Sequence, residues 1–107
     1  MAERQFNDLT PAEAERLFVL MEEMGESIQA IGKILRHGYE SCHPNLDAVA
    51  TNRRSLEQEL GHVTYVVAMM WAAGDLSRPN IDAHTAAKSE SIKPYLHHQP
   101  KEVTNES

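Results

Sequence analysis

Apolar side chains recur at spacings of three or four residues between Leu17 and Leu35, which is the period of one face of an α-helix. The residues in front of them form a helix start, with a threonine that can cap, a proline suited to the first helical position and a glutamate that can close a capping box (Thr10, Pro11 and Glu13). The pattern predicts one long amphipathic helix over residues 10–37, ending at Gly38.

Two further helices follow in the pattern. The first is expected over residues 52–74, and its stretch 63–73 is apolar on nearly every side. Such a helix is normally buried, and a small domain has little interior to offer it, so we expect part of it to pack against a second subunit. A turn is expected at residues 78–80 and a shorter helix over 81–91. No strand pattern is present, so the predicted class is all-α, a small helical bundle completed by homo-oligomerisation.

Length and composition limit the class of protein. A chain of 107 residues predicts one domain, here residues 10–98 between a flexible N-terminus (1–9) and a disordered tail (99–107). The net charge of −6 argues against a nucleic-acid polymer as partner. One cysteine, Cys42, excludes an internal disulfide and a zinc–thiolate cage. The N-terminus lacks the form of a signal peptide and the longest apolar run is too short for a membrane span, so we expect a cytoplasmic protein.

Glutamates gather within one turn of the first predicted helix, at Glu22, Glu23 and Glu26. Like charges at this spacing repel by roughly 0.2–0.5 kcal/mol per exposed pair. A solvated acidic face usually carries Lys or Arg three or four residues away, and none is present here. A bound divalent cation would offset the repulsion.

The second predicted helix carries a matching pair. Glu59 has no lysine or arginine within a turn, and His62 follows it at the helical spacing of three. Glu57 differs, because Arg53 and Arg54 precede it by four and three residues, and we expect it to form an ordinary surface ion pair. We therefore expect carboxylates from two helices to converge on one ion.

These two motifs, Glu22-Glu23-Met24-Gly25-Glu26 and Glu59-Leu60-Gly61-His62-Val63, resemble those of the all-α nucleoside triphosphate pyrophosphohydrolases, in particular MazG-like members of phage and bacterial type. The resemblance covers roughly residues 10–98. It implies a homodimer or homotetramer that uses Mg²⁺ or Mn²⁺ to hydrolyse (deoxy)nucleoside triphosphates to monophosphate and pyrophosphate. Purine substrates such as dGTP are candidates, and a phage-encoded member would act in the host cytoplasm.

The resemblance also implies roles for individual residues. Glu22 and Glu23 are the candidate catalytic residues, with Glu22 as a further ligand or as the base for the attacking water. The candidate metal ligands are Glu23, Glu26, Glu59 and His62. The candidate substrate-binding residues are Lys33, Arg36, His37, Lys88 and Lys93, although any one of them taken alone is better interpreted as a solvated surface cation.

His62 departs from the family pattern, which has aspartate at this place. Imidazole suits Mn²⁺, Co²⁺ or Zn²⁺ better than Mg²⁺. His62 could be a working ligand in a Mn²⁺-preferring enzyme, could lie outside a site of three glutamates, could mark a domain that binds nucleotide without hydrolysing it, or could simply pair with Glu59. Three functions follow as alternatives: an enzyme, a catalytically silent nucleotide- or metal-binding regulator, and a plain helical oligomerisation module.

Overall fold

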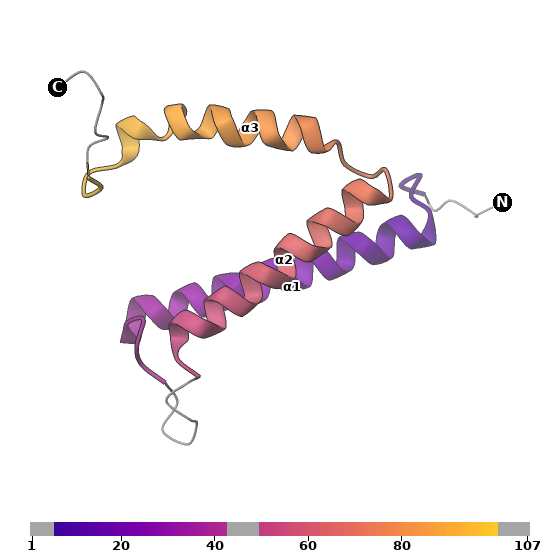
Figure 1. Ribbon diagram of the computed structural model, residues 1–107. Coiled ribbons are helices and arrows are strands. Elements are labelled where there is room, and N and C mark those ends of the chain that lie inside the picture. The colour runs from indigo at the N-terminus through magenta and orange to yellow at the C-terminus, as the bar shows by residue number, and fades with distance from the viewer. Residues whose placement is uncertain (1–5, 43–49, 101–107) are drawn as a thin grey trace. The chain divides into compact units, whose positions relative to one another are not determined.

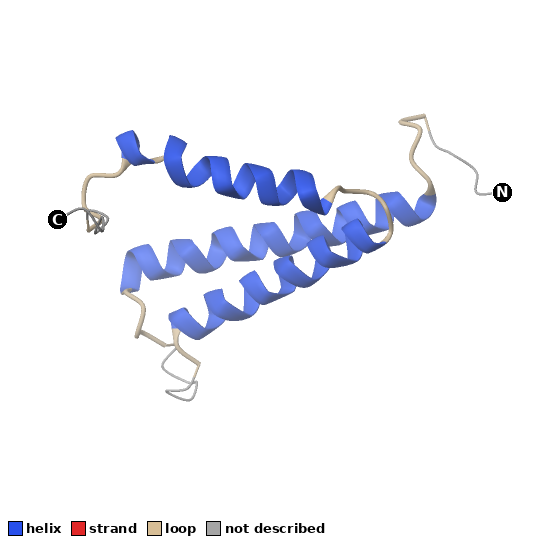
Figure 2. Cartoon of the chain, turned by 45° about the horizontal axis from the view of Figure 1, so that its top comes forward, coloured by secondary structure: helices blue, strands red, loops and turns tan. Residues whose placement is uncertain are grey.

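The computed structural model describes residues 6–42 and 50–100, and in them three α-helices account for most of the chain (Figure 1). The helices are α1 (Pro11–His37), α2 (Asn52–Ala72) and α3 (Arg78–Ser91), followed by a short 3₁₀-helix, η1 (Lys93–Tyr95). Apart from an isolated bridge between Cys42 and Thr51, the described residues contain no β-structure, so the all-α prediction is confirmed (Figure 2). The loop-breaking residues 43–45 and most of the expected disordered tail lie outside the described residues.

The chain divides into two compact units, Met1–Leu76 and Ser77–Ser107. The first contains α1 and α2, and the second contains α3 and η1. The single predicted domain over residues 10–98 stays a prediction.

Helix α1 begins and ends where the sequence predicts. The Thr10 hydroxyl accepts a hydrogen bond from the Glu13 backbone N–H at 3.1 Å, and the Thr10 N–H donates to Glu13 Oε1 at 2.8 Å. This is a complete capping box, which satisfies backbone donors that the first turn leaves unpaired. At the other end Gly38 has a φ of 89°, a conformation that a side chain would strain, and its N–H donates to the Ile34 carbonyl.

Helices α2 and α3 begin at side-chain caps. Thr51 caps α2, and Gly74, with a φ of 88°, follows its end as predicted. Helix α3 begins at Arg78, so the prediction of a turn at residues 78–80 is wrong. The Ser77 hydroxyl accepts from the Asn80 N–H at 3.2 Å, and Pro79 occupies the first turn, where its missing N–H costs nothing. No helix within the described residues is long and apolar enough to cross a membrane.

Helices α1 and α2 form an antiparallel hairpin (Figures 1 and 2). Arg16 near the start of α1 bonds to Asp75 after the end of α2, and Asn52 at the start of α2 bonds to the carbonyl of Gly38 after the end of α1. The facing residues are all buried or half-buried and follow the 4–3 spacing of a coiled-coil seam. This inner seam consists of Arg16, Leu20, Glu23, Ser27, Ala30 and Ile34 on α1 and Leu56, Glu59, Val63, Val66 and Met70 on α2.

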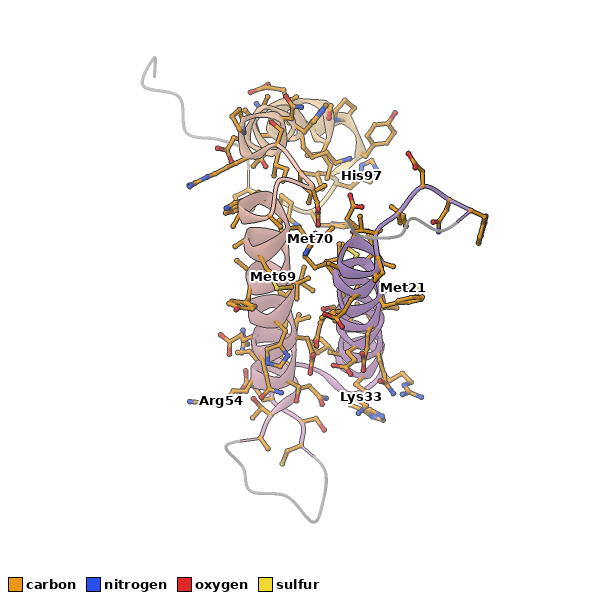
Figure 3. All side chains as sticks on the ribbon, turned by 90° about the vertical axis from the view of Figure 1, so that its right-hand side faces the viewer. Met21, Lys33, Arg54, Met69, Met70 and His97 are labelled. Carbon is orange, nitrogen blue, oxygen red and sulfur yellow. The ribbon has the colours of Figure 1, made fainter. Side chains whose placement is uncertain are left out.

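The apolar residues that predict α1 are not the ones that pack on α2. They form a second 4–3 series, here named the outer stripe, displaced by one residue from the inner seam and so turned by about 100° around the helix. Its members, all exposed in this chain, are Leu17, Met21, Met24, Ile28, Ile31 and Leu35. Figure 3 shows Met21 on the side of α1 away from α2, whereas Met70, which is 2% exposed, lies between the two helices.

Candidate metal centre

Three carboxylates and one imidazole meet between α1 and α2. Glu23 and Glu26 of α1 and Glu59 and His62 of α2 each offer one ligand atom, and these four atoms lie within 4.8 Å of one another. The structure thus brings together the four side chains that the sequence singles out as metal ligands. Their role as ligands stays a prediction.

The inner seam explains why these side chains converge. Glu23 and Glu59 occupy seam positions, where a coiled coil normally places apolar residues, so the packing of the hairpin aims both carboxylates at the helix interface. Glu26 and His62 lie one turn further along their helices on the same edge of the hairpin. The neighbouring seam residue Ser27 is small and 7% exposed, and its hydroxyl donates to the Glu23 carbonyl at 3.0 Å.

His62 lies between carboxylates from both helices. Its Nδ1 is 3.2 Å from Glu23 Oε2 and 3.5 Å from Glu59 Oε2. Among the described residues, this one oxygen of Glu59, Oε2, is buried and makes no hydrogen bond, although His62 Nδ1 lies 3.5 Å from it. Leaving a buried polar atom without a partner typically costs about 1–3 kcal/mol. A cation between the helices would remove this cost.

The electrostatics of the site also favour a bound proton or cation. The pKa of Glu26 lies above its ordinary value, chiefly because a hydrogen bond to Glu59 requires Glu26 to be protonated. Repulsion from the charge of Glu59 and desolvation add to the rise in this pKa, while a hydrogen bond to Glu23 and the charge of His62 act against it. The carboxylates therefore favour a positive guest, either a proton or a metal ion.

The donor set fits a divalent cation of intermediate hardness. Mg²⁺ binds oxygen ligands at about 2.0–2.1 Å, so two ligands on opposite sides of the ion lie roughly 4 Å apart. The 4.8 Å limit of the cluster exceeds this by an amount that small side-chain rotations can close. Carboxylates suit Mg²⁺ and Mn²⁺, and one imidazole moves the preference away from Mg²⁺.

Glu22 lies outside this cluster. It is exposed on α1, one residue before Glu23, and its assisting role stays a prediction. The basic residues Lys33, Arg36 and His37 are exposed on the last turns of the same helix. Lys33 follows Glu26 by seven residues, which corresponds to about 10 Å along a helix axis.

The remaining basic candidates belong to the second unit. Lys88 lies on α3 and Lys93 begins η1, where its Nζ is 3.0 Å from Glu90 Oε2. Their predicted contact with phosphate stays a prediction.

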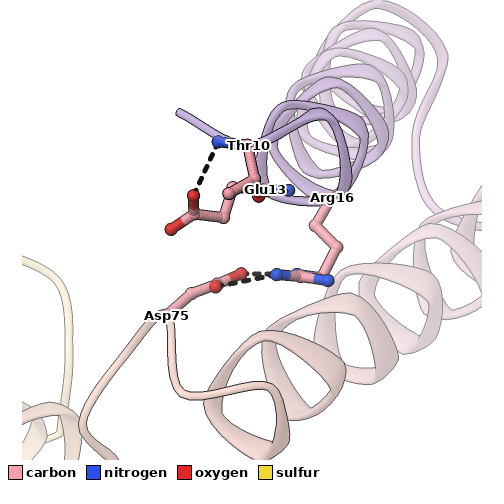
Figure 4. Close-up of polar contacts among 4 residues, drawn as sticks. All are labelled: Thr10, Glu13, Arg16 and Asp75. Atoms are coloured by element: carbon pink, nitrogen blue, oxygen red, sulfur yellow. Dashed lines mark hydrogen bonds and ion pairs between the residues drawn. The ribbon is translucent and has the colours of Figure 1, made fainter. Parts of the chain in front are cut away.

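Two ion pairs differ from expectation. Arg53 pairs with Glu40 at 2.7 Å rather than with Glu57, because the chain after Gly38 folds back onto the start of α2. The second pair, which sequence reasoning missed, joins Arg16 to Asp75 through two hydrogen bonds of 2.6 and 2.9 Å (Figure 4). The two residues are far apart in sequence, and the position of Arg16 on the 4–3 series of the inner seam is the one pattern that could have revealed it.

The Arg16–Asp75 pair also shifts the pKa values of both residues. The guanidinium holds the pKa of the Asp75 carboxyl below its ordinary value through hydrogen bonding and charge, against an opposing effect of desolvation. The carboxylate in turn raises the pKa of Arg16. The pair thus ties together the open end of the hairpin, away from the connection between α1 and α2.

No protein-family model, curated protein or solved structure matches the chain. Support for a function therefore comes from its own residues and their geometry.

Proposed function

We propose that the chain is a metal-dependent nucleoside triphosphate pyrophosphohydrolase that converts (deoxy)nucleoside triphosphates to monophosphate and pyrophosphate. The observation that carries the proposal is the cluster of Glu23, Glu26, Glu59 and His62 within 4.8 Å, in which one buried carboxylate oxygen has no hydrogen-bond partner in the described part of the chain. Bound metal ions would be needed because the chain has a net charge of −6 and the proposed substrate is a polyanion, so the two would otherwise repel each other.

The residues in and beside the cluster would have different roles. Glu23 and Glu59 are held in the inner seam and would keep fixed positions, while Glu26 and His62 complete the donor set from the edge. Mg²⁺ or Mn²⁺ held by these residues would supply positive charge for the phosphates and an activated water molecule. Glu22, exposed beside the cluster, would accept the proton of that water, and exposed basic residues near the end of α1 would hold the phosphates or the base (Lys33, Arg36 and His37).

One observation favours a second candidate, a catalytically silent nucleotide- or metal-binding regulator. The imidazole of His62 already pairs with Glu23 at 3.2 Å, and a protonated imidazole there would supply part of the positive charge that a metal ion would otherwise bring. In that case the domain would bind nucleotide without releasing pyrophosphate.

Release of pyrophosphate from each of the four dNTPs, with Mg²⁺ and separately with Mn²⁺, tests the proposal. We expect release with at least Mn²⁺, a loss of roughly 100-fold or more in Glu59→Gln, and no loss in the control Glu57→Gln, which removes an exposed carboxylate from the same helix. Wild-type protein that releases no pyrophosphate with either ion would refute the enzyme. If the silent protein still binds nucleotide and His62→Asp gains release, the regulator is the correct alternative.

A further inference from the structure

The side of the hairpin opposite the outer stripe carries the candidate metal centre and is here named the metal face. Each of its residues precedes an inner-seam position by one, whereas the outer stripe follows the seam by one. Because α1 and α2 are antiparallel, this offset turns residues of both helices toward the same side of the hairpin. The metal face includes Glu15, Glu22, Glu26 and Lys33 on α1 and His62 and Tyr65 on α2.

The charge of α1 changes sign along this face. Glu15 and Glu22 lie between the metal centre and the open end of the hairpin. Lys33 and Arg36 lie on the other side, seven and ten residues after Glu26, which is about 10 and 15 Å along the helix axis. A polyphosphate held at the metal centre would be repelled from the open end and attracted toward the connection between the helices. Its free phosphates therefore extend toward Lys33.

Tyr65 lies on the acidic side of the metal centre. It follows His62 by three residues, so the two side chains are neighbours on α2, with β-carbons about 5–6 Å apart. Since His62 contacts Glu23 and α2 runs antiparallel to α1, Tyr65 lies at about the level of Glu22. Tyr65 is 70% exposed, so its ring offers an open face beside the metal centre.

The other aromatic side chains of the hairpin are placed differently. Phe18 lies beside the outer stripe, and Trp71 follows the seam residue Met70 by one, on the same side as that stripe. Tyr39 lies at the connecting end, where Arg53 Cζ is 4.3 Å from the centroid of its ring and covers one ring face. In the described part of the hairpin, Tyr65 is therefore the aromatic residue that a ligand of the metal centre would meet.

The chemistry at the two ends of the metal face suits the two ends of a nucleotide. A nucleobase stacks on an open aromatic ring, and this contact is tolerant of base identity because every base has a π-face. Met69, one turn beyond Tyr65, is half-buried and adds a soft apolar surface. Figure 3 shows Met69 and Lys33 toward opposite ends of the hairpin. The nucleoside and the terminal phosphates leave the α-phosphate in opposite directions, so phosphates at Lys33 direct the base to Tyr65.

We propose that a nucleoside triphosphate lies lengthwise on the metal face, with its base stacked on Tyr65, its α-phosphate at the metal centre and its terminal phosphates at Lys33. This orientation rests on the proposed function and adds to it a residue that recognises the nucleoside. Because Tyr65 contacts the base and Lys33 contacts the phosphate tail, ligands that carry only one of these parts separate the two roles.

Isothermal titration calorimetry of the full chain in Mn²⁺ tests the orientation with two probes. The first, dAMP, carries the base and one phosphate, and the second, inorganic tripolyphosphate, carries phosphates alone. We expect Tyr65→Ala to weaken dAMP binding by roughly 5-fold to 150-fold, the range typical of base stacking, and to leave tripolyphosphate binding unchanged. Lys33→Ala should have the reverse effect and weaken tripolyphosphate binding alone.

The matched control is Tyr65→Phe, which keeps the ring, loses the hydroxyl and should bind dAMP as wild type does. Circular dichroism should show unchanged helix content in every variant, because Tyr65 and Lys33 are exposed. The orientation is overturned if wild type does not bind dAMP or if Tyr65→Ala binds it as tightly as wild type. An equal loss of dAMP and tripolyphosphate binding in Tyr65→Ala would also overturn it.

The outcomes distinguish this proposal from the proposed function. Pyrophosphate release by wild type, together with dAMP binding that does not depend on Tyr65, would keep the enzyme and remove the base contact. Binding of dAMP that depends on Tyr65, without any pyrophosphate release, would keep the base contact and favour the silent regulator.

Discussion

The substitution Glu59→Gln should reverse its effect on stability when metal is added. Without metal, Glu59 Oε2 is buried and makes no hydrogen bond to any residue that the structure describes, a situation that costs about 1–3 kcal/mol. A glutamine amide carries no charge and can donate to the carboxylates of Glu23 and Glu26. We therefore expect the metal-free variant to be more stable than wild type by about 1–3 kcal/mol. For a domain of this size 1 kcal/mol raises the melting temperature by about 4–8 °C.

Added Mn²⁺ should reverse this order and make wild type more stable than Glu59→Gln. A ligand that binds only the folded state at about 1,000 times its dissociation constant stabilises it by about 4.1 kcal/mol, which exceeds the gain expected from the substitution. Wild type in excess Mn²⁺ should then melt above Glu59→Gln, which has lost one of the four ligands.

Melting followed by circular dichroism, at one fixed protein concentration and with Mn²⁺ or a chelator, measures both effects. The control Glu57→Gln should change stability by less than about 0.5 kcal/mol and keep the full response to Mn²⁺, because Glu57 is exposed and outside the cluster. If Glu59→Gln melts at or below wild type in chelator and gains as much as wild type from Mn²⁺, the buried carboxylate is not a metal ligand. That outcome would favour a plain helical oligomerisation module.

Three further substitutions test the hairpin itself. Asp75→Asn should lower the free energy of unfolding, measured by urea titration, near neutral pH. The lowered pKa of Asp75 contributes stability only while its carboxylate is ionised beside Arg16, so the difference from wild type should shrink as the pH falls below about 4. A pH-independent difference would contradict this. Met70→Ala should cost about 2–5 kcal/mol in the same assay, since Met70 is 2% exposed, and a loss below 1 kcal/mol would mean that the helices do not pack as described. Thr10→Ala should cost about 0.5–2 kcal/mol through loss of the capping box, and Thr10→Ser should restore most of it.

The helices could be predicted from sequence because their ends are set by local chemistry. The capping box at Thr10 and the glycines at 38 and 74 act within a few residues of the helix ends they define. The start of α3 could not be predicted in this way. The sequence Arg78-Pro79-Asn80 is typical of a turn, but the Ser77 cap places the same proline in the first turn of a helix. The isolated pattern of Pro and Asn does not distinguish these two outcomes.

Which face of α1 packs on α2 could not be read from hydrophobicity. The outer stripe is more apolar than the inner seam, which contains Arg16, Glu23 and Ser27, so hydrophobic periodicity selects the exposed face. The candidate site was nevertheless predictable, because unpaired glutamates three residues apart share a helix face whatever that face packs against. The convergence of α1 and α2 at these residues depends on the register of the hairpin, which the sequence pattern alone leaves open.

The arrangement of the two faces explains how a marginal hairpin could retain charged residues in its seam. Glu23 and Glu59 occupy positions where apolar side chains would pack, and the buried apolar residues of the described chain are few: Ala30, Val66 and Met70. Two helices with so small a core are at the lower limit of independent stability. Any partner that covered the outer stripe would add apolar burial without disturbing the seam carboxylates, because the stripe follows the seam by one residue whereas Glu26 and His62 follow it by three and so lie on the opposite side of the hairpin. Ile28→Lys changes only the outer stripe and should therefore leave the four ligand side chains in place, so Mn²⁺ should still raise the melting temperature of this variant as much as that of wild type; a lost response to Mn²⁺ would contradict the separation of the two faces.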